Sequence, residues 1–133
     1  MKYFKIEEFV ASPTAESLGI ENSPPASVVE SLTKLVTNVL DPLREEFGMP
    51  IYVNSGYRCE ALNKAVGGVA NSQHLRGEAA DITTGSRAGN MYLWRVMRKL
   101  NLPIDEAINE NDYAWIHVSH ARKNRRKYIK INR

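Results

Sequence analysis

His74 and Asp81, two residues of metal-ligand type, lie seven positions apart with Gly77 between them, and this spacing restricts the local fold. Two ligand atoms on one zinc ion are only about 3–4 Å apart, given metal–ligand bonds of about 2.0–2.3 Å. Residues seven positions apart would be roughly 10 Å apart along a helix and more than about 20 Å apart along a strand. The chain must therefore reverse direction between them, and Gly77 allows a tight reversal. We expect residues 79–82 to form a short strand that presents Asp81 from its end.

A second histidine, His117, lies in residues 115–120, which we predict to be a strand. Side chains alternate between the two faces of a strand, so that His117 shares a face with Ser119 and His120 points the other way. We therefore expect His117 to be a metal ligand and His120 to be a surface residue. Three protein ligands leave a fourth position for water, which is typical of catalytic zinc sites. The predicted ligands of one Zn²⁺ ion are His74, Asp81 and His117.

Two motifs carry a resemblance to a known family: Ser72-x-His74-x-x-Gly77-x-Ala79-x-Asp81 and the distant Trp115-Ile116-His117-Val118-Ser119. Together they resemble the zinc D-alanyl-D-alanine carboxypeptidase family. That family includes peptidoglycan carboxypeptidases, D-alanyl-D-alanine dipeptidases and phage L-alanyl-D-glutamate endolysins, and it shares its fold with the signalling domain of hedgehog proteins. The resemblance spans roughly residues 3–120 and also covers Ser55-Gly56-Tyr57-Arg58, Leu62-Asn63 and Val66-Gly67-Gly68.

The resemblance implies a zinc-dependent metallopeptidase that hydrolyses a peptidoglycan peptide bond. The bond would involve a D-amino acid, as in D-alanyl-D-alanine or L-alanyl-D-glutamate, and the partner would be a peptidoglycan stem peptide or cross-bridge. Arg58 matches the family's active-site arginine, which holds substrate and stabilises the transition state; the alternative is an arginine that ties down a turn. Ser72 and Ser119 are candidates for substrate binding, with turn and sheet packing as the alternative.

The general base is the point at which the chain departs from the family. Peptide hydrolysis needs a group that takes the proton of water and passes it to the leaving amine. The family often carries a carboxylate three positions before the second zinc histidine, where this chain has Ala114. Glu110 and Asp112 are the nearby candidates, and we prefer Glu110. Ala114 also leaves open an alternative, a catalytically inactive zinc-containing module that binds the cell wall on the same fold.

Patterns elsewhere predict an α+β fold with a small antiparallel sheet packed against helices, and the resemblance implies that this fold is of the hedgehog/DD-peptidase type. Apolar residues at helical spacing indicate a helix over residues 28–47, begun by a capping box at Ser27 and Glu30 and bent by Pro42. Turn-forming residues at 10–27 predict a surface loop, and the family resemblance implies that this loop packs over the core and helps to shape the cleft. Further helices are predicted at 60–66 and 87–101, the latter with Met91, Trp94, Met97 and Leu100 or their neighbours facing inward. Short strands are predicted at 51–53, 104–108, 115–120 and 128–131.

The length of the chain and the absence of long apolar runs limit the possible domain organisation and location. We expect the 133 residues to form one zinc peptidase domain, and we expect a monomer. No apolar run is long enough for a membrane span, and the first residues lack a signal peptide. Synthesis in the cytoplasm is therefore expected, with action at the bacterial cell wall after release by another factor, as for a phage or prophage lysin.

Charge is unevenly distributed along the chain. The net charge is +3, but residues 121–133 carry seven basic and no acidic side chains, so that the other 120 residues have a net charge of −4. Such a segment binds an anionic polymer, either a bacterial wall or nucleic acid, or it is simply solvated. We do not expect a nucleic-acid partner, because no recognition motif accompanies the basic residues.

Overall fold

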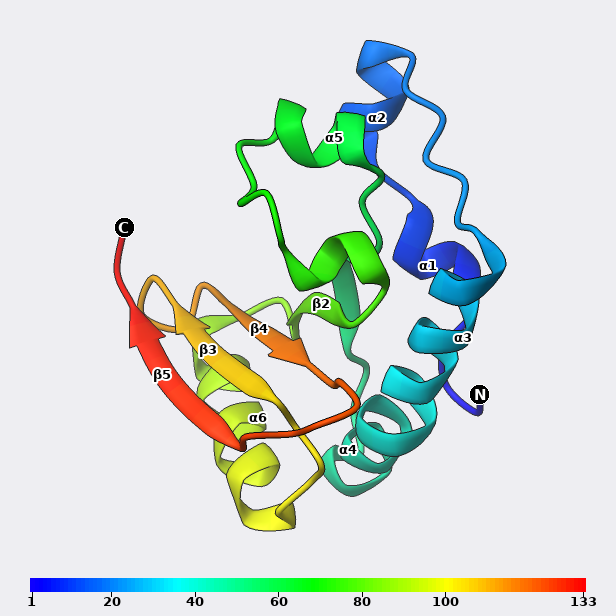
Figure 1. Cartoon of the computed structure of the whole chain (residues 1–133). Coiled ribbons are helices and arrows are strands. Elements are labelled where there is room, and N and C mark those ends of the chain that lie inside the picture. Colours follow the sequence, from blue (N-terminus) through cyan, green and yellow to red (C-terminus); the bar gives the residue numbers. More distant parts are fainter.

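The computed structural model describes residues 1–133 and has helices packed against one five-stranded sheet (Figure 1). The strand order is β1-β2-β4-β3-β5. The strands are β1 (Tyr52–Ser55), β2 (Ala79–Thr83), β3 (Glu106–Glu110), β4 (Trp115–Ser119) and β5 (Lys127–Ile131). The helices are α1 (Ile6–Val10), α2 (Pro13–Leu18), α3 (Ala26–Leu35), α4 (Asp41–Phe47), α5 (Glu60–Ala65) and α6 (Arg87–Leu100), with a π-helical turn η1 (Val36–Leu40) and a 3₁₀ turn η2 (Gln73–Arg76). The predicted α+β class is confirmed.

The sheet is antiparallel except at one edge, where β5 runs parallel to β3. The chain leaves β4 and returns to the start of β3, where Arg126 N–H donates to Ile104 O and Lys127 N–H donates to Asp105 O. A strand that begins beside the start of β3 must run in the same direction as β3. The prediction of a last strand at the edge is confirmed, and the expectation of a purely antiparallel sheet is corrected for β5.

One continuous helical segment runs from Ala26 to Phe47 and confirms the predicted long helix. The predicted capping box is wrong, because Ser27 lies inside the helix and the N-cap is Pro25, whose side chain makes no cap hydrogen bond. Prolines fix an extended backbone ahead of Ala26, so that the helix begins there without a capping side chain. The π turn η1 immediately precedes Pro42, where the chain lacks an N–H to continue the regular ladder.

Residues 10–27 contain a short helix, α2, where a loop was expected. Ser12 Oγ accepts a hydrogen bond from Ala15 N–H at 3.1 Å, and Pro13 occupies the first turn. Gly19 ends the helix with a φ of +67°. Ser-Pro at the start and glycine at the end are the ordinary signals of a helix, so the sequence carried this information.

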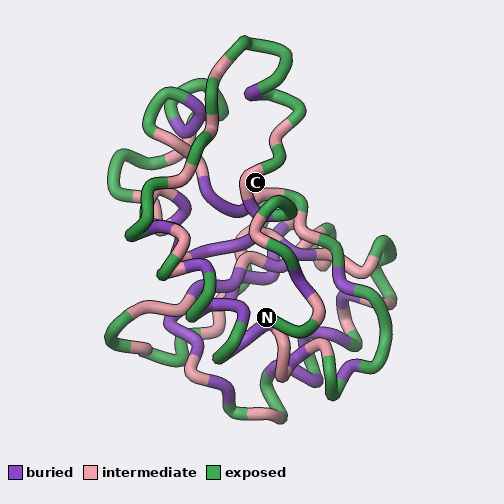
Figure 2. The backbone as a smooth tube through the Cα atoms, turned by 90° about the vertical axis from the view of Figure 1, so that its right-hand side faces the viewer, coloured by how far each residue is buried: buried purple, intermediate pink, exposed green.

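The two faces of the sheet have different roles. One face packs against α6 and contributes buried side chains to a core of 23 residues, among them Ala80, Ile82, Ala107, Ile116 and Val118. Figure 2 shows buried positions in the interior of the molecule and exposed ones along the outer loops. On α6, Trp94 and Met97 are buried as predicted, whereas Met91 and Leu100 are only partly buried and Leu93 and Val96 lie inside instead. The opposite face of the sheet is left for the cleft described below.

The third strand begins two residues later than predicted. Residues 102–104 form a tight turn in which Ile104 N–H donates to Leu102 O at 2.7 Å, so β3 starts at Glu106. The strand β3 ends at Glu110, which lies next to the turn into β4.

Candidate metal centre

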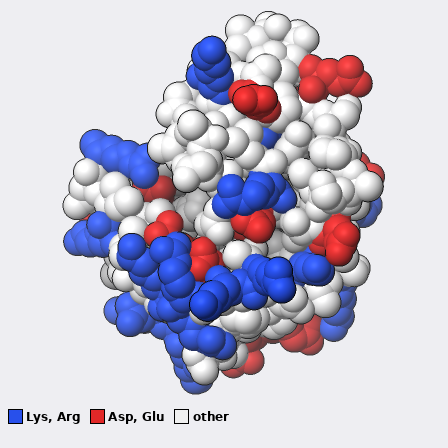
Figure 3. Space-filling model, viewed as in Figure 1, with Lys and Arg blue, Asp and Glu red and all other residues white.

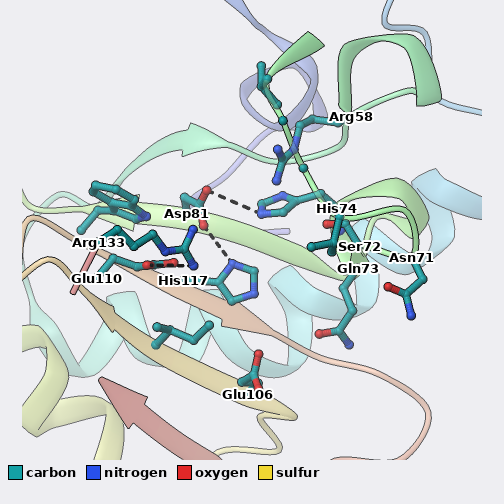
Figure 4. A pocket seen from close by; sticks show the side chains of 16 residues that line it. Arg58, Asn71, Ser72, Gln73, His74, Asp81, Glu106, Glu110, His117 and Arg133 are labelled. Atoms are coloured by element: carbon teal, nitrogen blue, oxygen red, sulfur yellow. Dashed lines mark hydrogen bonds and ion pairs between the residues drawn. The ribbon is translucent and has the colours of Figure 1, made fainter. Parts of the chain in front are cut away.

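Three side chains of ligand type converge on the open face of the sheet (Figure 4). The ligating atoms of His74, Asp81 and His117 all lie within 4.8 Å of one another. Asp81 and His117 are direct partners across β2 and β4, and His74 reaches them from the turn η2. The structure thus brings together the three residues that were predicted as ligands.

The reversal between His74 and Asp81 depends on Gly77, as expected. Gly77 has a φ of +71° and ends η2. A Cβ at this position would lie 2.7 Å from the carbonyl oxygen of Val28 on α3, so there is no room for a side chain. Asp81 does not come from the end of its strand, however, because β2 continues to Thr83 and Asp81 lies at its middle.

A hydrogen bond decides which ring nitrogen of His74 is available. Nδ1 lies 2.7 Å from the carbonyl oxygen of Gly56, which can only accept, so Nδ1 carries the proton. In the neutral ring, Nε2 then presents a lone pair 3.5 Å from Asp81 Oδ2. Two such acceptors repel each other unless a cation lies between them or the ring takes up a second proton. A backbone carbonyl bound to the remote nitrogen is the usual partner of a metal-bound histidine.

The carboxylate of Asp81 faces both histidines at once. Its Oδ1 lies 2.9 Å from His117 Nδ1, while Oδ2 faces His74. Burial by itself would raise the pKa of Asp81, but the hydrogen bond from His117 and the neighbouring His74 ring outweigh burial and hold that pKa well below its usual range. An ionised carboxylate between two imidazoles is a donor set that suits Zn²⁺, so the residues present fit this ion.

The three residues lie in a cleft of about 450 Å³. Arg58, Ser72 and Glu110, all predicted as site residues, line the same cleft. Ser119 does not line it; its side chain is fully buried, and its hydroxyl bonds to the backbone N–H and carbonyl of Glu106. That placement favours the sheet-packing alternative for Ser119. Ser72 Oγ accepts from His74 N–H at 3.2 Å, which leaves its O–H free to donate into the cleft.

Arg58 is held by its neighbours on both sides. Asn22 Nδ2 donates to Tyr57 O at 2.9 Å, and Asn22 Oδ1 accepts from Cys59 N–H at 2.7 Å. The backbone N–H of Arg58 donates to His74 O at 3.1 Å, which joins the arginine turn to the histidine turn. The guanidinium Nε is buried and has no hydrogen-bond partner. A buried donor without a partner is rare in folded proteins, and here it lies beside the cleft.

A second depression of about 250 Å³ adjoins the cleft, and Arg58 and Asp81 line both. Its far wall is formed by residues 11–14, which run from the end of α1 into the first turn of α2. Burial lowers the pKa of Arg58, and the charge of Asp81 opposes this shift. Residues 11–14 therefore shape the depression beside the cleft, whereas no residue of 10–27 lines the cleft itself.

The two candidate carboxylates are placed differently. Glu110 is the last residue of β3, lines the cleft and is 5% exposed. Asp112 lies in the following turn, is not among the cleft residues, and pairs with Arg87 at 3.0 Å. Ala114 is exposed in the same turn. Burial raises the pKa of Glu110, so that its environment differs from that of an exposed carboxylate.

Several cleft residues had no signal that singled them out. Gln73, Glu106, Trp115 and Arg133 also line the cleft. Gln73 Nε2 donates to Asp105 Oδ2 at 3.1 Å, which ties the histidine turn to the start of β3. Glu106 and Glu110 share a strand face by simple alternation, so a correctly placed β3 would have predicted both.

His120 directly follows the end of β4 and lies outside the cleft. Its Nδ1 lies 2.6 Å from Pro103 O, and its Nε2 lies 3.2 Å from Asn38 Nδ2. These contacts leave His120 partly buried, so it is less exposed than a simple surface residue.

Some of the basic side chains of segment 121–133 form ion pairs with acidic groups. Three of its seven basic side chains lie within 4.0 Å of acidic groups, namely Arg125, Lys127 and Arg133. Figure 3 shows basic side chains gathered over the β5 side of the molecule, with acidic ones between them and the central hollow. No helix is both long and apolar enough to cross a membrane.

Comparisons with known proteins agree with the motifs. Residues 2–119 match the family model described as Peptidase M15. A stretch of 49 residues is 45% identical to the zinc D-Ala-D-Ala carboxypeptidase of Streptomyces albus G. That stretch makes up 36% of this chain and 19% of the relative, so most of the relative has no counterpart in the alignment.

Proposed function

The chain belongs to the M15 peptidase family, and from this premise we propose that it is a zinc-dependent peptidase that hydrolyses peptide bonds of bacterial peptidoglycan. The bond would be of the D-Ala-D-Ala carboxypeptidase or the L-Ala-D-Glu endopeptidase type, and residues 1–133 would form one peptidase domain. The observation that carries the proposal is the convergence of His74, Asp81 and His117 in a cleft that also holds Glu110 and Arg58.

In the proposed site, His74 Nε2, a carboxylate oxygen of Asp81 and His117 Nδ1 would hold one Zn²⁺ ion. When bound, zinc supplies a water of lowered pKa and polarises the scissile carbonyl. The Nδ1–H of His74 donates to Gly56 O and keeps the ring oriented. Asp81 and His117 pair directly across β2 and β4, and this pairing keeps their side chains on one face of the sheet.

Glu110 is proposed as the general base. Its carboxylate accepts the proton of the attacking water and then donates that proton to the leaving amine. Burial raises its pKa, which makes the carboxylate a stronger base toward the water, and the resulting carboxylic acid is still far more acidic than the protonated leaving amine. The turn that follows β3 carries Asp112 away from the cleft, which leaves Glu110 as the candidate that faces it.

Arg58 and Ser72 are proposed to bind the substrate. The guanidinium of Arg58 offers a planar set of donors that matches a carboxylate or a developing oxyanion, and its buried Nε has no competing partner. The Ser72 hydroxyl is free to donate to a peptide carbonyl. Arg58 borders both depressions, so a peptide bound to it would extend on both sides of the metal centre.

Defined wall peptides test this proposal. Zinc-loaded protein is incubated with stem peptides that end in D-Ala-D-Ala and with peptides that contain L-Ala-D-Glu, and mass spectrometry identifies the bond cut. Glu110→Gln is expected to lower kcat by at least about 100-fold, whereas Asp112→Asn, the matched control, retains activity. Intact peptides with the wild type, in the presence of bound zinc, would instead support a cell-wall-binding module.

A further inference from the structure

The strand β5 and the residues after it lie outside the segment that matches the family, residues 2–119, yet they reach the cleft. Ile131 pairs with Glu110 in the parallel register of β5 and β3. Asn111 N–H donates to Ile131 O at 2.8 Å, and Arg133 N–H donates to Asn111 Oδ1 at 2.8 Å. The backbone of Arg133 is therefore fixed against the residue that directly follows Glu110.

The side chain of Arg133 turns into the cleft beside Glu110 (Figure 4). Its Nη2 lies 3.4 Å from Glu110 Oε1. No hydrogen bond reaches that buried oxygen, and Arg133 is the only basic side chain that forms an ion pair with Glu110. The other nitrogens of the guanidinium remain open to the cleft and to solvent, since 62% of the side chain is exposed.

We propose that Arg133 is a positioning residue that holds the Glu110 carboxylate in place for proton transfer. The inference rests on the proposed function, because it assigns Arg133 to the base of that reaction. An ion pair to Oε1 restrains the carboxylate and leaves Oε2 to accept a proton from water. Even a small displacement of a catalytic group lowers the rate of the reaction, so the group must be held firmly.

The electrostatics of Glu110 agree with this geometry. Burial raises the pKa of its carboxyl group, and Arg133 is the strongest opposing influence. The other charged groups that act on it are Asp81 and Glu106, which raise the pKa further, and His117, which lowers it. Removal of the Arg133 charge is therefore expected to raise the pKa of Glu110, because less opposes the effect of burial.

The test compares Arg133→Gln with Arg133→Lys and with Lys130→Gln, using the full chain loaded with zinc and a wall peptide that the wild type cuts. Lys130 is an exposed residue of β5 that forms no ion pair, so its change removes one charge from the same strand. Arg133→Gln is expected to lower kcat about tenfold and to change KM less than about twofold, because it affects the reacting group and not substrate binding. Arg133→Lys is expected to recover part of kcat, and Lys130→Gln to match the wild type.

Two kinetic results would overturn the proposal. Equal kcat values for Arg133→Gln and Lys130→Gln would mean that Glu110 does not need the ion pair. A higher KM with an unchanged kcat would mean that Arg133 binds substrate and does not position the base.

A second readout does not depend on activity. The ¹³C resonance of the Glu110 carboxyl group is titrated in zinc-free protein, and Arg133→Gln is expected to raise the pKa of Glu110 relative to the wild type and Lys130→Gln. If the wild type cuts no wall peptide, the proposed function fails, and this titration still decides whether Arg133 acts on Glu110. An unchanged pKa overturns the contact itself.

Discussion

Gly77→Ala separates two reasons why the reversal between His74 and Asp81 requires glycine. A left-handed conformation costs a residue with a Cβ about 1–2 kcal/mol. The new Cβ would also lie 2.7 Å from the carbonyl oxygen of Val28, a backbone atom that cannot rotate away. Overpacking of this kind typically costs a further 1–3 kcal/mol or so. We therefore expect Gly77→Ala to lower the free energy of unfolding by about 2–5 kcal/mol.

Gly48→Ala is the matched control. Gly48 has a φ of +78°, but no atom lies within 4 Å of its virtual Cβ, and it ends α4 outside the cleft. Only the conformational cost of about 1–2 kcal/mol applies there. Urea denaturation of both variants at 25 °C gives the two losses, and their difference isolates the contact with α3.

Gly77→Ala and Gly48→Ala also test whether the turn at Gly77 sets the geometry of the metal centre. If the reversal places His74 beside Asp81, zinc affinity, measured by competition with a chelating dye, falls in Gly77→Ala and stays unchanged in Gly48→Ala. Equal losses of stability in the two variants would refute the packing argument. Unchanged zinc affinity in a destabilised Gly77→Ala would refute the claim that this turn sets the geometry of the site.

Three further changes address other parts of the site. Asn22→Ala is expected to lower the free energy of unfolding by about 1–3 kcal/mol, measured by urea denaturation, because the carbonyl and N–H groups on both sides of Arg58 lose a buried partner. Arg58→Lys is expected to lower kcat/KM for wall peptides by about tenfold to a hundredfold without loss of bound zinc, since hydrogen bonds to charged groups contribute about 1.5–3 kcal/mol and an ammonium cannot form the same fork. Hydrogen bonds from Arg125 hold the pKa of Asp105 below its usual value, so the stability that Asp105 contributes is present above about pH 4 and is lost as the pH falls through the lowered pKa. Asp105→Asn should therefore flatten the fall in the free energy of unfolding under acid, and a fall as steep as that of the wild type would contradict this.

The approach of His74 to Asp81 was predictable because it depends on short-range rules, whereas the inclusion of His117 rested on the resemblance to a known family. Ligand spacing requires a reversal, Gly77 permits one, and strand alternation selects His117 over His120. The long helix was predictable for a similar reason, since its apolar periodicity extends over residues 28–47 and Gly48 ends it.

Contacts between distant segments were not predictable in this way. The approach of Arg133 to Glu110 depends on the parallel pairing of β5 with β3, and nothing local indicates that direction. For the same reason the basic segment was interpreted only by its charge, although Arg125 and Arg133 each pair with an acidic residue. The start of β3 was misplaced by two residues, because a tight turn at 102–104 and a strand share the same apolar pattern there.

The central claim is that one zinc ion, held by His74, Asp81 and His117, is required to hydrolyse a wall peptide bond. The most direct measurement is the release of free amino groups from purified peptidoglycan by zinc-loaded wild type and by His74→Ala, with the metal content of each sample determined. We expect one zinc per chain and amine release for the wild type, and loss of both for His74→Ala. Amine release by metal-free wild type, or full zinc occupancy in His74→Ala, would contradict this claim.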